Sequence, residues 1–133
     1  MVLLDTDVCI YLLRGQGHSV ARRLREMPVG EIGTTAITAA ELRFGALRSA
    51  KPEGNMLRVE QFLRPIAQLP FDGRAGMFFA RIKADLVARG QVIGPMDLLI
   101  AATALSTGAR LVTHNRREYE RIPRLHVESW RMD

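Results

Sequence analysis

The sequence predicts an α/β domain with a mainly parallel central sheet. Short apolar runs of strand length alternate along the chain with longer stretches whose apolar residues recur every three to four positions. Glycines and prolines separate the two kinds of segment, as is typical of βαβ units. The 133 residues, 47% of them hydrophobic, suffice for a sizeable core, so we expect residues 1–133 to form a single domain.

The first half of the chain begins with a buried strand, because Val2, Leu3 and Leu4 are all apolar. In the helical stretch at 36–50, Ile37, Ala40, Phe44 and Leu47 share one face, which we expect to be buried. The last helix of this half should bend or end near Pro65. We expect strands at 2–4 and 31–35, and helices at 7–13, 18–26, 36–50 and 53–69.

The second half has two clear helix ends, because Gly90 and Gly108 follow long periodic stretches. The later helix is almost entirely apolar and should lie deep in the core. We expect strands at 69–71, 110–115 and 124–130, and helices at 73–89 and 94–108.

Composition limits the class of protein. No apolar stretch approaches the roughly 20 residues of a membrane helix, and the N-terminus lacks the pattern of a signal peptide, so we expect a cytoplasmic protein without a membrane partner. Cys9 is the only cysteine, so an intrachain disulfide is excluded and a buried, reduced thiol is expected. The net charge of +5 favours a polyanionic partner such as nucleic acid, although arginine richness also reflects GC-rich genomes.

Asp5 and Asp7 stand between two apolar segments. Asp5 ends the first expected strand, and ligand sites of α/β sheets lie beyond the carboxyl ends of strands. The alternative is that one of them simply caps the following helix, a role that suits Asp7. Two acids, however, are more than one cap requires.

Glu41 and Asp97 also lie where charge is unexpected. Glu41 shares the helical face of Ile37 and Phe44, and a buried carboxylate without a partner is costly. A salt bridge to an arginine of another helix is the alternative. Asp97 lies in the first turn of a helix that begins at Pro95, where the helix dipole alone could account for it.

These acids are too far apart in sequence for a local chelating loop, so they must converge through the fold. A cluster of carboxylates needs a positive partner, and Mg²⁺ or Mn²⁺ prefers such oxygen ligands. One cysteine and three scattered histidines, His18, His114 and His126, offer no zinc site and are expected to be structural or exposed. Carboxylate-bound metal in a basic protein indicates phosphodiester hydrolysis.

Four segments together resemble the PIN-domain family, and within it the VapC-type toxins of bacterial toxin–antitoxin pairs. They are "LLDTDVCIYLL", "TTAITAAELRFGALRS", "GQVIGPMDLLIAATAL" and "LVTHNRREYERIPRLHVESW". The resemblance implies a three-layer α/β/α domain and a Mg²⁺- or Mn²⁺-dependent endoribonuclease that inhibits translation. It implies that Asp5, Glu41 and Asp97 are the catalytic metal ligands and that Thr6 and Thr113 support them.

The resemblance also implies partners. Such toxins are neutralised by a small VapB-type antitoxin whose tail enters the active site, and they usually form homodimers. The larger complex binds promoter DNA through the antitoxin. Toxins with an ending similar to "REYERIP" cut initiator tRNA. The residues of this chain that contact RNA are not indicated.

Two positions depart from the family pattern. Asp7 stands where Asn is common, and it could bind metal through water or cap the helix. Asn115 stands where a fourth acid is frequent, and Glu118 could turn inward to replace that acid. Which of Asn115 and Glu118 completes the site, and whether one or two ions bind, stays open.

Two other functions fit part of the pattern. A non-catalytic PIN-like module that binds RNA or protein would explain the missing fourth acid, but not the three that remain. "LLDTDV" also fits the opening of haloacid-dehalogenase-type phosphatases, in which the first Asp is a nucleophile. That function leaves Glu41 unexplained and lacks a suitably placed lysine.

Overall fold

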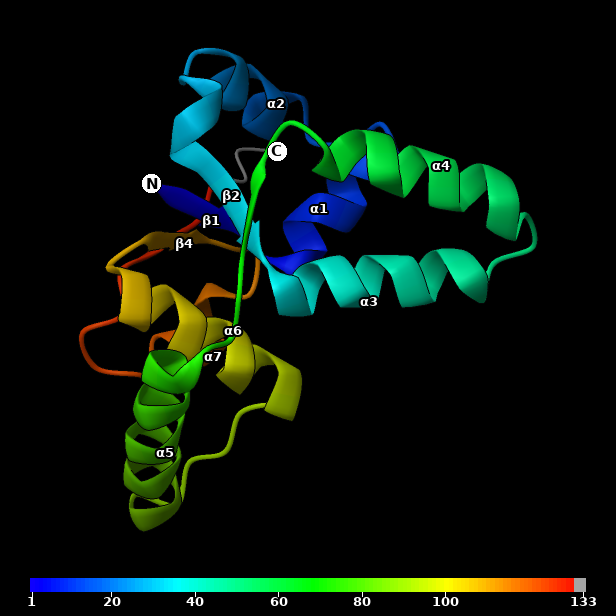
Figure 1. Ribbon diagram of the computed structural model, residues 1–133. Coiled ribbons are helices and arrows are strands. Elements are labelled where there is room, and N and C mark those ends of the chain that lie inside the picture. Colours follow the sequence, from blue (N-terminus) through cyan, green and yellow to red (C-terminus); the bar gives the residue numbers. More distant parts are fainter. Residues whose placement is uncertain (131–133) are drawn as a thin grey trace.

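A computed structural model describes residues 1–130 (Figure 1). Its centre is a sheet with the strand order β3-β2-β1-β4-β5, in which all pairings are parallel. The predicted α/β class is therefore confirmed. The strands are β1 (Val2–Leu4), β2 (Ile32–Thr35), β3 (Ala67–Leu69), β4 (Arg110–Val112) and β5 (Val127–Glu128).

Local signals set the ends of several helices. The Thr35 side chain caps α3 by accepting from the Thr38 N–H, and Asp72 caps α5 in the same way. Pro95 opens α6, and Gly108 ends it with a φ of 70°. The helices are α1 (Thr6–Leu13), α2 (His18–Arg25), α3 (Ala36–Leu47), α4 (Pro52–Leu63), α5 (Gly73–Ala88), α6 (Pro95–Thr107) and α7 (Arg116–Tyr119), with a 3₁₀ turn, η1 (Val29–Glu31).

The helices cover both faces of the sheet, which gives three layers (Figure 1). Along β1 the side chains alternate between the faces. Val2 and Leu4 pack in one core cluster with residues of α1 to α4, whereas Leu3 packs in a second cluster with residues of α5, α6 and α7. Buried on both faces, β1 can be wholly apolar.

Several predicted boundaries are wrong. Helix α4 ends at Leu63, which confirms the expected bend or end near Pro65, whereas β3 pairs with β2 over 67–69 rather than over the expected 69–71. Strand β4 stops at Val112, where Thr113 turns towards β1, and β5 spans only two residues of the expected 124–130. Helix α7 was not expected.

The predicted buried face of α3 is also wrong. Phe44 and Leu47 are each 63% exposed, and Ala40 is exposed as well. The buried residues of α3 are small or polar ones together with a single leucine: Thr38, Ala39, Leu42 and Ala46. Small side chains allow α3 to lie close to its neighbours. Because the buried face of α3 differs from the predicted one, Glu41 lies half-buried at its edge.

The expectations for the cysteine and the histidines are confirmed. Cys9 is a fully buried free thiol. His18 and His126 are exposed, and His114 is half-buried with its ring against Tyr11. Over residues 1–130, no helix combines the length and the apolar character that crossing a membrane requires.

Replacement of Leu111 tests the second core cluster. Leu111 lies on β4, between β1 and β5, and is fully buried. Leu111→Ala should lower the free energy of unfolding by about 2–5 kcal/mol, because it leaves a cavity. Val87→Ala, at a position that is 65% exposed, should change it by less than about 0.5 kcal/mol. Urea unfolding of both variants measures this, and equal effects would contradict the described packing.

Candidate active site

The candidate site lies beyond the carboxyl ends of β1, β2 and β4. The chain crosses from β1 to β2 on one side and returns to β4 on the other, so the strand order diverges at β1. Such a switch point is where α/β sheets place their ligand sites. Asp5 and Thr113 directly follow β1 and β4, and Thr35 ends β2.

Asp5 is the most deeply placed acid of the site, with only 3% of its surface exposed. It caps α1: its Oδ1 accepts from the Thr6 N–H at 2.9 Å, and its Oδ2 accepts from Thr113 Oγ1 at 2.7 Å. Burial, together with the charges of Asp7 and Asp97, raises the pKa of Asp5 to about 7. The cap is thus Asp5 and not Asp7.

Tyr119 links Asp5 to Asp97. Its hydroxyl lies 3.2 Å from an oxygen of each carboxylate. A phenol has one proton, so it donates to one carboxylate at a time, and the second contact requires a proton on the other acid. Burial, with the charges of Glu118 and Glu41, raises the pKa of Asp97 to about 6. Burial likewise raises the pKa of Tyr119, which therefore stays a phenol.

Thr6 links the same centre to Glu41. The Thr6 hydroxyl donates to Glu41 Oε1 at 2.7 Å and lies 3.0 Å from the hydroxyl of Thr38. Its backbone N–H already serves Asp5. One residue of α1 therefore orients an acid of its own segment and an acid of α3.

Asp7 faces the end of β4. Its carboxylate accepts from the His114 N–H at 3.2 Å and lies 3.4 Å from the Thr113 hydroxyl. It therefore fastens the first turn of α1 to the segment after β4. Its charge is close enough to Asp5 to raise that residue's pKa.

Glu118 has turned towards the site. Its Oε1 accepts from the Gly94 N–H at 2.9 Å, and its Oε2 accepts from the Asn115 amide at 2.7 Å. Burial disfavours its charged form, but these hydrogen bonds hold the pKa of Glu118 below its ordinary value. The same side chain lies beside Asp97, whose pKa it raises.

Within residues 1–130, no arginine or lysine forms an ion pair with this group, although the charge of Arg121 helps to lower the pKa of Glu118. None of the ion pairs formed within residues 1–130 involves any of the five acids, Asp5, Asp7, Glu41, Asp97 and Glu118. The salt bridge considered for Glu41 is thus not formed. The oxygen-only donor set fits a hard divalent cation. In the same range, however, no three His, Cys, Asp or Glu side chains already converge on one ion position.

Sequence reasoning missed Tyr119 and Thr38. Tyr119 lies in the charged run "RREYER", which has no apolar period, and only its burial shows that the hydroxyl needs a partner. Thr38 lies three residues before Glu41, in the first turn of α3. The expected acids and threonines do lie together at one end of the sheet.

A groove of about 300 Å³ opens beside Glu41, between α1, α3 and α4. Its walls are largely apolar, with two arginines at the rim. The lining residues include Ile10, Leu13, Leu42, Val59, Gly45, Arg14, Arg58 and Glu41. The groove thus runs directly from an apolar surface to one acid of the site.

Comparison with known proteins defines the class. The family model of the PIN domain matches residues 2–125, so the chain belongs to the PIN-domain family. Over 96% of both chains it is 36% identical to the tRNA(fMet)-specific endonuclease VapC of Shigella flexneri. It is 37% identical, over the same shares, to ribonuclease VapC2 of Haemophilus influenzae.

Solved structures agree with this assignment. The DNA-bound VapBC complex of Salmonella typhimurium contains a chain that is 35% identical, with a TM-score of 0.93 over 98% of both chains. The promoter-bound VapBC2 complex of Rickettsia felis gives 31% identity and a TM-score of 0.91, over 98% of this chain and 100% of that one. The three-layer PIN-like fold is thereby confirmed.

The raised pKa of Asp5 yields a test of the metal-free protein. An unfolded Asp titrates near 3.8 and the folded one near 7, so the folded state binds more protons between these values. Stability should therefore fall as the pH rises from about 4 to about 7. Asp5→Asn removes this loss and should be more stable than wild type at pH 8. Because one pKa unit corresponds to about 1.4 kcal/mol, we expect a gain of at least about 1 kcal/mol.

Thermal melting in EDTA, from pH 4 to pH 8, measures the stability of wild type and of Asp5→Asn. The pH dependence of the variant should be shallower, with the residual slope due to Asp97. A variant that is less stable than wild type at pH 8 would show that Asp5 is stabilised, not strained, in its charged form.

Proposed function

We propose that the chain is the toxin of a VapBC-type toxin–antitoxin pair and acts as a Mg²⁺- or Mn²⁺-dependent endoribonuclease. Asp5, Glu41 and Asp97 would hold the ion. One observation carries the proposal: three acids from three elements are joined through Thr6 and the Tyr119 hydroxyl, and none of them forms an ion pair with a cationic side chain of residues 1–130. The ribonuclease names of the relatives support the reaction type.

A bound ion would polarise the scissile phosphate and lower the pKa of an attacking water. The chain supplies the orientation of the ligands. Thr113 and the Thr6 N–H fix the carboxylate of Asp5, and the Thr6 hydroxyl fixes Glu41. Tyr119 holds Asp5 and Asp97 at a common distance. Outer hydrogen bonds of this kind orient metal ligands.

Glu118 is the better fourth group of the proposed site. It lies beside Asp97 and carries a negative charge at neutral pH, since its pKa is lowered. Asn115 instead donates its amide to Glu118 and so supports it. We propose that Asp7 acts through Thr113 and His114 rather than on the ion.

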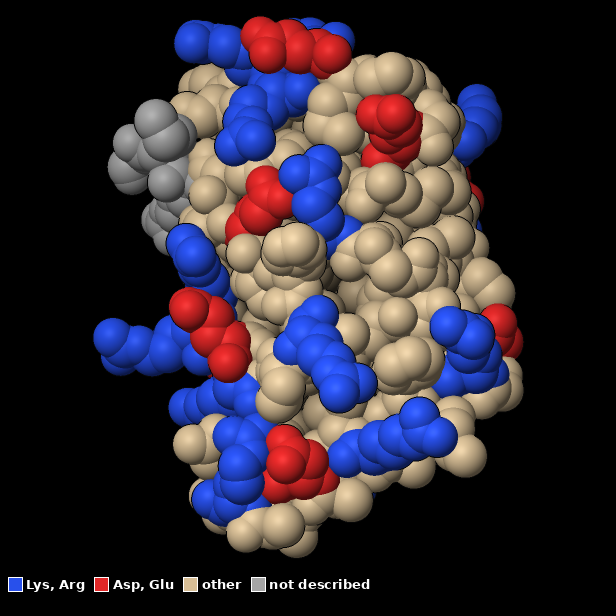
Figure 2. All heavy atoms as spheres, turned by 90° about the vertical axis from the view of Figure 1, so that its left-hand side faces the viewer, with Lys and Arg blue, Asp and Glu red and all other residues tan. Residues whose placement is uncertain are grey.

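RNA is the substrate class that fits the charge. The net charge is +5, and Figure 2 shows basic side chains spread over a whole face with acids beside several of them. Such a surface attracts phosphates without reading a sequence. Because a relative is named for tRNA(fMet), we propose initiator tRNA as the first RNA to be tested.

Substitution of the acids tests the reaction. Asp5→Asn, Glu41→Gln and Asp97→Asn should each lower the rate of RNA cleavage by at least about 100-fold, since metal stabilisation supplies several kcal/mol. Glu53→Gln, an exposed acid in the first turn of α4, serves as the matched control and should cleave like wild type.

EDTA should abolish cleavage, and added Mg²⁺ or Mn²⁺ should restore it. Cleavage that is unchanged in EDTA would refute the metal mechanism. RNA binding without cleavage in every divalent ion would instead favour a non-catalytic PIN-like module, and release of phosphate from small esters alone would favour a phosphatase.

We also propose a VapB-type antitoxin as partner, within a complex of a toxin homodimer that binds promoter DNA through the antitoxin. Both similar solved structures named above are VapBC complexes bound to DNA. The groove beside Glu41 supports an antitoxin tail there, because its apolar walls suit a partner segment and it leads to the acids. Co-expression of a cognate VapB-type partner should relieve growth arrest by the toxin.

Two helical glycines give a matched test of the groove. Gly45 lines it, whereas Gly54 of α4 does not, and at each position an added Cβ meets open space. Gly45→Trp should fill the groove and weaken antitoxin binding at least tenfold, while the purified variant keeps its ribonuclease rate. Gly54→Trp should bind like wild type. Calorimetric titration with antitoxin measures this, and equal affinities would place the antitoxin elsewhere.

A further inference from the structure

The loop from Arg89 to Gly94 leads directly into the candidate site. Gly94 is the N-cap of α6, and Asp97 follows in the first turn of that helix. The placement of Asp97 therefore depends on where this loop ends. Two bonds attach the loop to the α7 segment: the Gly94 N–H donates to Glu118, and Arg121 Nη1 donates to the Val92 carbonyl at 2.7 Å.

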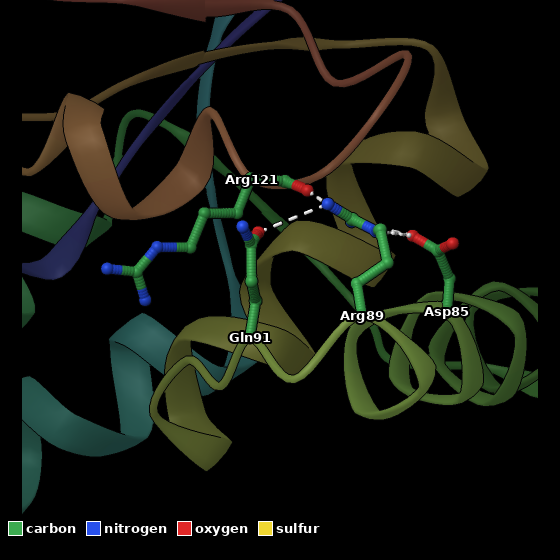
Figure 3. Close-up of polar contacts among 4 residues, drawn as sticks. All are labelled: Asp85, Arg89, Gln91 and Arg121. Atoms are coloured by element: carbon green, nitrogen blue, oxygen red, sulfur yellow. Dashed lines mark hydrogen bonds and ion pairs between the residues drawn. The ribbon is translucent and has the colours of Figure 1, made fainter.

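Arg89, at the start of the loop, donates in turn to the segment after α7. Its Nη2 donates to the backbone carbonyl of Arg121 at 2.7 Å, and its Nη1 donates to Gln91 Oε1 at 3.1 Å (Figure 3). Asp85, one turn earlier on α5, holds the same guanidinium at 2.6 Å and 2.9 Å. Every nitrogen of the Arg89 guanidinium is thus engaged within the protein.

We propose that Arg121 and Arg89 are positioning residues of the nuclease site, an inference that rests on the proposed function. Their two hydrogen bonds connect the 89–94 loop and the segment after α7 in both directions, and we call this pair of bonds the arginine tie. Arg121 holds the loop before α6, and Arg89 holds the backbone of Arg121. The tie keeps Asp97 at the distance from Tyr119 that links it to Asp5.

We expect the arginine tie to affect the position of Asp97 more than the free energy of unfolding of the protein. Arg89 and Asp85 are well exposed, and exposed ion pairs contribute little to the free energy of unfolding. A small displacement of a metal ligand, by contrast, is costly for catalysis. Arg89 is also poorly available to bind RNA phosphates, because all three of its guanidinium nitrogens already donate to groups within the protein.

Arg121→Ala and Arg89→Ala test the proposal against Arg117→Ala. Arg117 is an exposed arginine of α7 for which the described part of the chain gives no hydrogen bond or ion pair, so it controls for lost charge. We expect the first two variants to lose about 10- to 100-fold in kcat with KM little changed. Arg117→Ala should keep kcat. Arg121→Lys, which retains one donor for Val92, should recover part of the rate.

Hydrogen exchange of the metal-free protein gives a readout that needs no activity. The amide of Gly94 should exchange several-fold faster in Arg121→Ala than in wild type or Arg117→Ala, while the melting temperature stays similar. Unchanged exchange at Gly94 would overturn the proposal. So would a loss of activity that appears as a raised KM and not as a lowered kcat, because lost charge would weaken RNA binding. If wild type cleaves no RNA, the proposed function fails, and exchange alone decides whether the tie exists.

Discussion

The structure depends on a group of carboxylates that forms no ion pair with any arginine or lysine of residues 1–130. Asp5 is almost completely buried, yet Asp7 and Asp97 are close enough to raise its pKa further. Such a group is unfavourable in its charged form. What the fold supplies instead is hydroxyl groups: Thr6, Thr113 and Tyr119 each place an oxygen between acids or against one.

The helices supply a second, weaker compensation. Asp5 caps α1, and Asp97 lies in the first turn of α6, so two helix N-termini face the site with their partial positive charge. This contribution is typically below about 1 kcal/mol per charge and cannot neutralise a cluster. The remaining repulsion is what a divalent cation would relieve. Under the proposed function, the repulsion in the metal-free protein follows from gathering the acids that would bind the cation.

The parts of the site that the sequence predicts are those with local signals. Asp5 follows an apolar strand, and Asp97 follows Pro95 at a helix start, so both positions can be deduced from neighbours. Periodicity predicts the wrong buried face for the helix that carries Glu41, because α3 buries small residues and exposes Phe44. For Glu41 the family resemblance is therefore the better predictor.

Other features could not be predicted because their causes are not local. Tyr119 acquires its role only when the end of β4 brings α7 against Asp5. The bonds of Glu118 join it to Gly94, 24 residues away in sequence. The edge strands β3 and β5 contain polar residues and pair over only two or three positions, so their periodic signal is weak.

Calorimetric titration of the metal-free protein with Mn²⁺ at pH 6, in buffers of different ionisation enthalpy, measures whether a divalent cation relieves the repulsion among the acids. With pKa values of about 7 for Asp5 and about 6 for Asp97, Asp5 is mostly protonated and Asp97 is about half protonated at that pH. We therefore expect Mn²⁺ to bind and to release protons, and Asp97→Asn to lose most of this binding. Absence of binding, or binding without proton release, would contradict this expectation.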